Sequence, residues 1–241
     1  YRQIVLAPAT GQEAVNHTIL GFHLADKWRI GAVLFADTAI AHASETVEFN
    51  TLDAAELPAK DWITDGAKGR ERHVHGYPAG VVEGGYGMSD GKTHHGAANL
   101  MYGPEKLAAI AREEARHEEY RLDDAEFMIV AFGTAARTVR PVIDAMRAEG
   151  VRVGLFRPIT VWPFSYEALG QAAKGKRQVL VYELNWGQMV DDVRIAIRSD
   201  LPITSVAHHG THAIGFGKLD TPEIVRAMLE RNMLKEEALA R

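Results

Sequence analysis

The stretch Phe127-Met-Ile-Val-Ala-Phe-Gly-Thr134 decides the fold that we predict for this chain. Its continuous apolar run is typical of a strand in a parallel sheet that is covered on both faces. A glycine turn follows, then a helix with apolar residues on one face through Met146, and Gly150 is a natural stop. We expect Pro141 to delay or kink this helix, because proline lacks the N–H that an interior helical position donates.

Strands and helices continue to alternate from this unit to the end of the chain. We predict strands at 151–156, 178–182 and 203–206, and helices after Pro163, over 188–198 and from Pro222. Such alternation predicts a complete parallel α/β domain with right-handed crossovers.

A separate βαβ unit precedes it. Residues 4–7 and 32–35 are apolar strands, and small and apolar residues recur at helical spacing from Gly11. We expect the second strand to be buried on both faces.

The region between these units differs in composition. Residues 50–103 are rich in glycine and histidine and show neither helical nor strand periodicity, so we interpret them as an interdomain connection or a loop that partners order. Pro104 then opens a polar helix that we expect to run through Glu119. The predicted organisation is a first domain at 1–49, a connection with a linking helix at 50–121, and a second domain at 122–241.

Composition excludes several classes of protein. The 241 residues carry a net charge of -5, which provides no broad basic field for nucleic acid. There is no cysteine, so iron–sulfur clusters held by thiolates must lie on other chains. Apolar runs have the length of strands, which predicts a soluble cytoplasmic protein without a membrane segment.

Because Tyr1 stands directly before an apolar strand, we expect a fragment of a longer protein.

Several motifs, in this order, resemble one enzyme family. They are Leu6-Ala-Pro-Ala-Thr-Gly-Gln-Glu13, Val130-Ala-Phe-Gly-Thr-Ala-Ala-Arg137, Gly154-Leu-Phe-Arg-Pro-Ile-Thr-Val-Trp-Pro-Phe164 and Val181-Tyr-Glu-Leu-Asn-Trp-Gly-Gln-Met189. Together they resemble the C-terminal two-thirds of the α subunits of 2-oxoacid:ferredoxin oxidoreductases, nearest the branched-chain and 2-oxoglutarate types. The resemblance implies an α/β fold, with a partial pyrimidine-binding thiamine domain followed by a transketolase C-terminal-like domain.

The resemblance also implies a reaction and its partners. In the intact complex, a 2-oxoacid would be oxidatively decarboxylated with coenzyme A to acyl-CoA, CO₂ and reduced ferredoxin. Thiamine diphosphate and Mg²⁺ would be held mostly by a β subunit, and iron–sulfur clusters by ferredoxin-like or γ subunits. The residues that activate the cofactor in this family would precede Tyr1, so we expect no catalytic residue here and an inactive fragment. The residues present do not reveal which 2-oxoacid is used.

Two other functions remain open at this point. One is a β-type subunit of a thiamine-dependent 2-oxoacid dehydrogenase or a transketolase-like enzyme, and the other is a non-catalytic assembly module. Strands at 4–7 and 32–35 lack flanking strands upstream, so we also expect a homodimer or larger oligomer that buries the residues before Phe49.

Candidate site residues have competing interpretations. Gln12 and Glu13 are cofactor-side candidates, although Glu13 also suits the first turn of a helix. Gly133 and Thr134 form either a tight turn or an anion site. A last group, Glu183, Asn185 and Gln188, flanks a strand-to-helix junction where open parallel sheets place ligands. The alternative is helix capping by Asn185 and a subunit contact by Gln188.

Histidines invite a metal interpretation at three places, His73 and His75, His94 and His95, and the run from His208 to His212. The last run lacks the carboxylate and the helical spacing of zinc hydrolases. We therefore predict no metal site, and the family resemblance implies a surface turn at the run from His208 to His212.

Overall fold

The computed structural model describes residues 2–28, 30–49, 104–207 and 221–234. The predicted connection at 50–103 and the three histidine groups lie outside these residues.

The first sheet has three strands in the order β2-β1-β6. Strand β1 (Ile4–Leu6) pairs in parallel with β2 (Ala32–Leu34), and helix α1 (Gly11–Trp28) connects them, which confirms the predicted βαβ unit. The short helix α2 (Thr38–His42) follows. On its other side β1 pairs antiparallel with β6 (Thr160–Trp162), a strand that the sequence did not predict.

Strand β2 is an edge strand and is not buried on both faces as predicted. Its residues are half-buried or exposed, and Leu34 exposes 40% of its surface. The strand lacks a neighbouring strand on its other side among the described residues, and its main contacts are with α1 and β1. The apolar run at 32–35 therefore predicted the strand correctly but not its burial.

The second sheet has five strands in the order β3-β5-β4-β7-β8. Its parallel members are β4 (Phe127–Val130), β5 (Val153–Pro158), β7 (Gln178–Glu183) and β8 (Ile203–Ala207). Strand β3 (His117–Tyr120) joins one edge and runs antiparallel to β5. The sheet thus includes residues before 122, where the predicted second domain starts.

Helix α4 (Pro104–Glu114) is shorter than predicted. The expected helix through Glu119 is wrong beyond Glu114, because the next residues pair with β5 as strand β3. Glu118 in this strand accepts hydrogen bonds from Arg157 and Arg140, contacts that a local polar pattern does not reveal.

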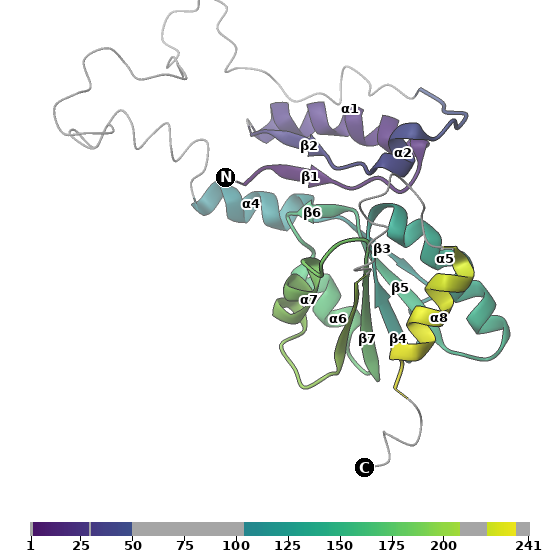
Figure 1. Ribbon diagram of the computed structural model, residues 1–241. Helices are drawn as coiled ribbons and strands as arrows, with labels where there is room; N and C mark the ends of the chain where they lie inside the picture. Colours follow the sequence, from purple (N-terminus) through teal and green to yellow (C-terminus); the bar gives the residue numbers. More distant parts are fainter. Residues whose placement is uncertain (1, 29, 50–103, 208–220, 235–241) are drawn as a thin grey trace, which may run out of the picture.

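Helices cover both faces of the five-stranded sheet (Figure 1). Helices α5 (Gly133–Ala148) and α8 (Pro222–Asn232) pack on one face, and α6 (Tyr166–Ala172) and α7 (Met189–Ile197) on the other. Helix α5 contains Pro141 and still begins at Gly133, so the predicted late start is wrong. None of the helices in the described ranges is long and apolar enough to cross a membrane.

The chain passes directly from one sheet into the other. Strand β5 ends at Pro158 and β6 begins at Thr160, with Ile159 between them. The carbonyl of Ile159 accepts a hydrogen bond of 2.8 Å from the N–H of Ala7. Glu114, which is buried, adds a second link by binding Lys27 at 2.7 Å and the indole of Trp28 at 2.8 Å.

Candidate functional site

The strand order creates a crevice at the carboxyl ends of β4 and β7. From β4 the chain passes through α5 to β5 on one side, and from β7 it passes through α7 to β8 on the other. Helices α5 and α7 also lie on opposite faces of the sheet. Loops that diverge in this way leave a crevice between them, which is where open α/β sheets bind their ligands.

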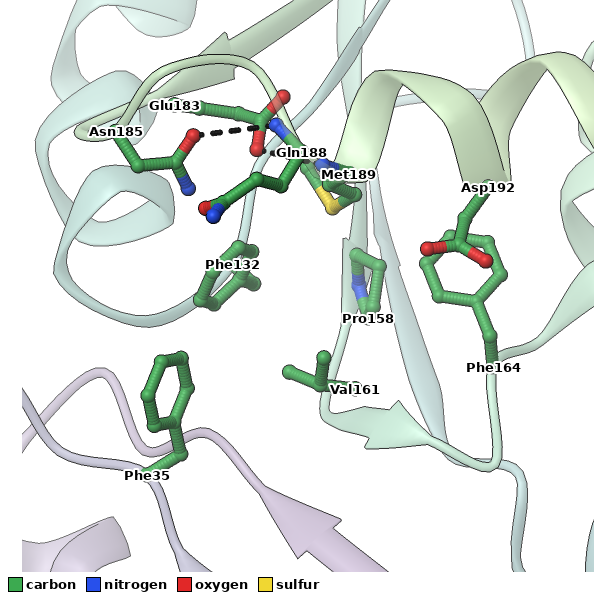
Figure 2. Close-up of a pocket in the computed structure, with 10 residues that line it drawn as sticks. All are labelled: Phe35, Phe132, Pro158, Val161, Phe164, Glu183, Asn185, Gln188, Met189 and Asp192. Atoms are coloured by element: carbon green, nitrogen blue, oxygen red, sulfur yellow. Dashed lines mark hydrogen bonds between the residues drawn. The ribbon is translucent and has the colours of Figure 1, made fainter. Parts of the chain in front are cut away.

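A pocket of about 200 Å³ lies at this point, between the two sheets (Figure 2). The second sheet and its helices provide most of its wall, while β6 and the loop after β2 provide the rest. The lining residues are Phe35, Phe132, Pro158, Val161, Phe164, Glu183, Asn185, Gln188, Met189 and Asp192. Three of the sequence candidates, Glu183, Asn185 and Gln188, are therefore brought together in one pocket.

Glu183 is the buried acid of this group. It is 1% exposed, and its two carboxylate oxygens accept hydrogen bonds from the backbone N–H groups of Met189 and Val190 at 2.8 and 3.1 Å. These N–H groups belong to the first turn of α7, where the helix dipole favours a negative charge. Glu183 thus caps α7, the structural role that the sequence had suggested for Asn185.

Asn185 and Gln188 lie on the loop between β7 and α7. The Asn185 side chain accepts hydrogen bonds from the N–H groups of Gly187 at 2.8 Å and Gln188 at 3.4 Å, so it stabilises the turn that leads into the helix. Gln188 itself makes no side-chain capping bond to α7, and Figure 2 shows it extending into the pocket on the side of Phe132.

Gly133 and Thr134 do not line the pocket, although Phe132 directly before them does. Gly133 has a φ of +55°, which glycine adopts without strain, and this agrees with the tight-turn interpretation. Thr134 is 2% exposed, and its hydroxyl has no hydrogen-bond partner within the described residues. The anion-site alternative at this turn stays a prediction.

Asp192 is the second acid of the pocket and projects from α7. It accepts a hydrogen bond from the hydroxyl of Tyr166 at the start of α6. Burial of Tyr166, together with this hydrogen bond to Asp192, raises the pKa of the phenol to about 12. Tyr166 therefore keeps its proton at neutral pH and acts as the donor to Asp192.

A second polar group, the Arg157 cluster, holds the two sheets together. Arg157 of β5 is 2% exposed and forms a two-pronged ion pair with Glu13 of α1, with Nη1 at 2.8 Å from Oε1. Its Nη1 also binds Glu118 of β3 at 3.1 Å. One guanidinium thus connects α1, β3 and β5, through residues as far apart as 144 positions in the chain.

Glu13 is held in this cluster as a carboxylate. Burial alone would raise the pKa of Glu13, but the hydrogen bonds from Arg157 and from the N–H of Ala9 outweigh it, so the pKa is lowered. Its neighbour Gln12 binds both the N–H and the carbonyl of Glu48, at 2.7 and 2.8 Å. Both cofactor-side candidates are therefore engaged within the chain, and their predicted cofactor role stays a prediction.

His17 lies one helical turn after Glu13 and is buried. Burial lowers the pKa of His17, the negative charge of Glu13 opposes this, and Arg157 and Arg116 lower it further. Its Nδ1 has no hydrogen-bond partner within the part of the chain that the structure describes. His17 is thus neutral in the folded protein near neutral pH.

Arg157 and the aromatic wall of the pocket were not among the residues predicted from the sequence. A signal for Arg157 was present, since an arginine inside an apolar strand requires a charged partner when it is buried. For Phe35 and Phe132 the local pattern gave no signal. They stack at a ring distance of 6.1 Å only because the loop after β2 meets the loop after β4.

The described residues contain no group of three His, Asp or Glu side chains that could hold a metal ion. Both oxygens of Glu13 accept hydrogen bonds from Arg157, so this carboxylate links α1 to β5.

Residues 125–217 match the family model described as pyruvate:ferredoxin oxidoreductase core domain II. The chain is 33% identical over 196 residues to the ketoisovalerate oxidoreductase subunit VorB of Methanothermobacter marburgensis, which covers 81% of this chain and 53% of that protein. It is 30% identical to the 2-oxoglutarate synthase subunit KorA of Methanocaldococcus jannaschii, over 95% of this chain and 64% of that protein. The chain thus spans about half to two thirds of the length of these relatives.

Among solved structures, the chain is similar to a 2-oxoglutarate:ferredoxin oxidoreductase from Magnetococcus marinus that has 2-oxoglutarate, coenzyme A and succinyl-CoA bound. The TM-score is 0.66 at 18% identity, and the match covers 95% of this chain and 42% of that chain. This likeness confirms the predicted α/β fold class.

Proposed function

We propose that this chain is the C-terminal part of an α-type subunit of a thiamine-diphosphate-dependent 2-oxoacid:ferredoxin oxidoreductase. The complete enzyme would oxidatively decarboxylate a 2-oxoacid with coenzyme A and yield acyl-CoA, CO₂ and reduced ferredoxin. It would act in the cytoplasm, as an assembly with a β-type subunit and with ferredoxin-like or γ subunits.

The similarity to VorB is the observation that carries this proposal. It extends over 81% of the chain and therefore includes more than the second sheet alone. The similarity to KorA, a 2-oxoglutarate synthase subunit, covers 95% of the chain. A similarity limited to residues 125–217 would support only a shared domain.

The described residues support a positioning role for this chain and not a chemical one. No group of three His, Asp or Glu side chains among them could hold a metal ion, and cysteine is absent from the whole sequence. We therefore propose that the cofactor and Mg²⁺ are held mostly by the β-type subunit and the iron–sulfur clusters by other subunits. The division into 1–49, 50–121 and 122–241 is part of this proposal.

The Arg157 cluster explains how such positioning would work. Arg157 fixes the start of α1 to β3 and β5, so the first sheet is anchored to the second near the pocket. A partner that binds the first sheet would then be held in a fixed orientation to the second.

The test is reconstitution of the complete subunit that contains this chain with its β-type and ferredoxin-like partners. We expect coenzyme A-dependent reduction of ferredoxin with at least one substrate from a panel of branched-chain 2-oxoacids, pyruvate and 2-oxoglutarate. An assembled complex that reduces NAD⁺ through a lipoyl acceptor but never ferredoxin would instead indicate the dehydrogenase type. A complex that assembles but turns over none of the 2-oxoacids would indicate that the chain belongs to a non-catalytic assembly module.

The isolated chain provides a second test. Calorimetric titration with thiamine diphosphate and Mg²⁺ should show no binding near micromolar concentration, which would correspond to about -8 kcal/mol. A tight stoichiometric isotherm would contradict the proposed division of the cofactor site between subunits.

A further inference from the structure

The pocket between the two sheets has the size and the walls of a site for one aromatic ring. Its volume is about 200 Å³, and an apolar cavity of about 150 Å³ is large enough to hold benzene. Phe35 and Phe132 stand on one side, with their planes inclined by 25°, and Val161 and Met189 also line the pocket (Figure 2). Aromatic and aliphatic walls of this kind favour a flat apolar group.

Polar groups at the pocket provide hydrogen-bond acceptors. The carboxylate of Asp192 and the amide of Gln188 both line it, and Gln188 is not used to cap α7. Asp192 already accepts one hydrogen bond from Tyr166, and a carboxylate has capacity for several. A bound ring with an N–H or O–H donor would therefore find acceptors here.

The charges of the pocket argue against an anion. The two charged side chains that line it within the described residues, Glu183 and Asp192, are both acidic. The N-terminus of α7, which would otherwise attract an anion, already carries the carboxylate of Glu183. A second negative charge would be repelled, whereas a neutral or positively charged group would not.

The pocket also lies where the topology expects a ligand, at the carboxyl ends of β4 and β7. We propose that it binds a single aromatic ring, neutral or positively charged, that carries an N–H or O–H donor. This inference goes beyond the proposed function and does not depend on it.

Such a ring has two sources, a free small molecule or a tryptophan or tyrosine side chain of another protein chain. Indole represents the isolated ring, and N-acetyl-tryptophanamide represents the same ring with a peptide backbone on either side. Binding of both indicates room for a side chain from another chain, and binding of indole alone indicates a free molecule. Both results support the site, whereas binding of neither probe overturns it.

The experiment is ligand-observed NMR titration of the purified chain, with benzylamine and benzoate as a pair of opposite charge. We expect indole and benzylamine to bind, and benzoate to bind at least about tenfold more weakly than benzylamine, because of the two carboxylates. The substitution Asp192→Asn removes one of these negative charges and should reduce the difference in affinity between benzylamine and benzoate. Equal affinity of the two probes in the unaltered chain would refute the charge argument.

A matched pair of variants locates the site. Phe35→Ala removes a pocket wall, while Phe22→Ala removes an exposed phenylalanine on α1 that does not line the pocket. Both rings are more than half exposed, so neither change should prevent folding. We expect about tenfold weaker indole binding for Phe35→Ala, from lost ring contacts, and no change for Phe22→Ala. Equal effects of the two variants would place the probe elsewhere.

Discussion

Replacing Glu13 by glutamine should measurably destabilise the protein, because it leaves the guanidinium of Arg157 with half of its ion pairs. Removing one partner of a fully buried pair costs about 3–5 kcal/mol. Here Arg157 is 2% exposed but Glu13 is 30% exposed, and Arg157 keeps Glu118 at 3.1 Å. We therefore expect a loss of about 2 kcal/mol, roughly half of the full value. For a chain of this size that corresponds to a fall in Tm of about 4–8 °C.

Urea and thermal denaturation followed by circular dichroism would measure this loss. The control is Glu149→Gln, because Glu149 forms an equally two-pronged pair with Arg226, at 2.8 and 2.6 Å, on the exposed surface. Exposed pairs contribute little, so this variant should be indistinguishable from the unaltered protein. Equal destabilisation by the two substitutions, or no effect of Glu13→Gln, would refute the argument that burial of Arg157 makes this pair important.

The ion pair between Glu13 and Arg157 makes the stability of the protein depend on pH. The pKa of Glu13 is lower in the folded protein than its ordinary value of 4.5. The unfolded chain then binds the proton more readily, so the stabilisation by Glu13 is complete above about pH 4.5 and disappears as the pH falls through the folded pKa. The difference in stability between the unaltered protein and Glu13→Gln should therefore shrink in acid.

Three further outcomes are expected. Because burial lowers the pKa of His17 from 6.5, stability should fall as the pH drops below 6.5, and His17→Gln should remove this component from urea midpoints measured on either side of that pH. Glu183→Ala should cost about 2–3 kcal/mol, since two N–H groups of α7 lose their acceptor, whereas Asp191→Ala in the same helical turn should cost far less; equal losses would contradict the capping role. Light scattering coupled to size exclusion should show a dimer or larger oligomer that Phe22→Asp dissociates, because Phe22 of α1 is 75% exposed and β2 is an edge strand; a sharp monomer at high dilution would refute this.

Local sequence patterns determined most of the individual elements. The apolar run at Phe127 and the glycine turn at Gly133 predicted β4 and the turn that follows it, because a buried parallel strand and a positive φ each require particular residue types. The same reasoning placed Glu183, Asn185 and Gln188 at a junction between strand and helix, and the structure finds them around one pocket. The role of Glu183 as the cap of α7 was not evident, because it depends on how the loop folds back.

Only the tertiary structure decided which segments meet. Strand β6 pairs with β1, and Arg157 binds Glu13, across separations of about 150 residues. The pocket likewise needs Phe35 from the first sheet beside Phe132 from the second. A periodicity records which face of an element is apolar, but it does not record the element that will cover that face. Contacts between distant segments arise when the chain closes its core, and their energies depend on geometry that no single segment contains.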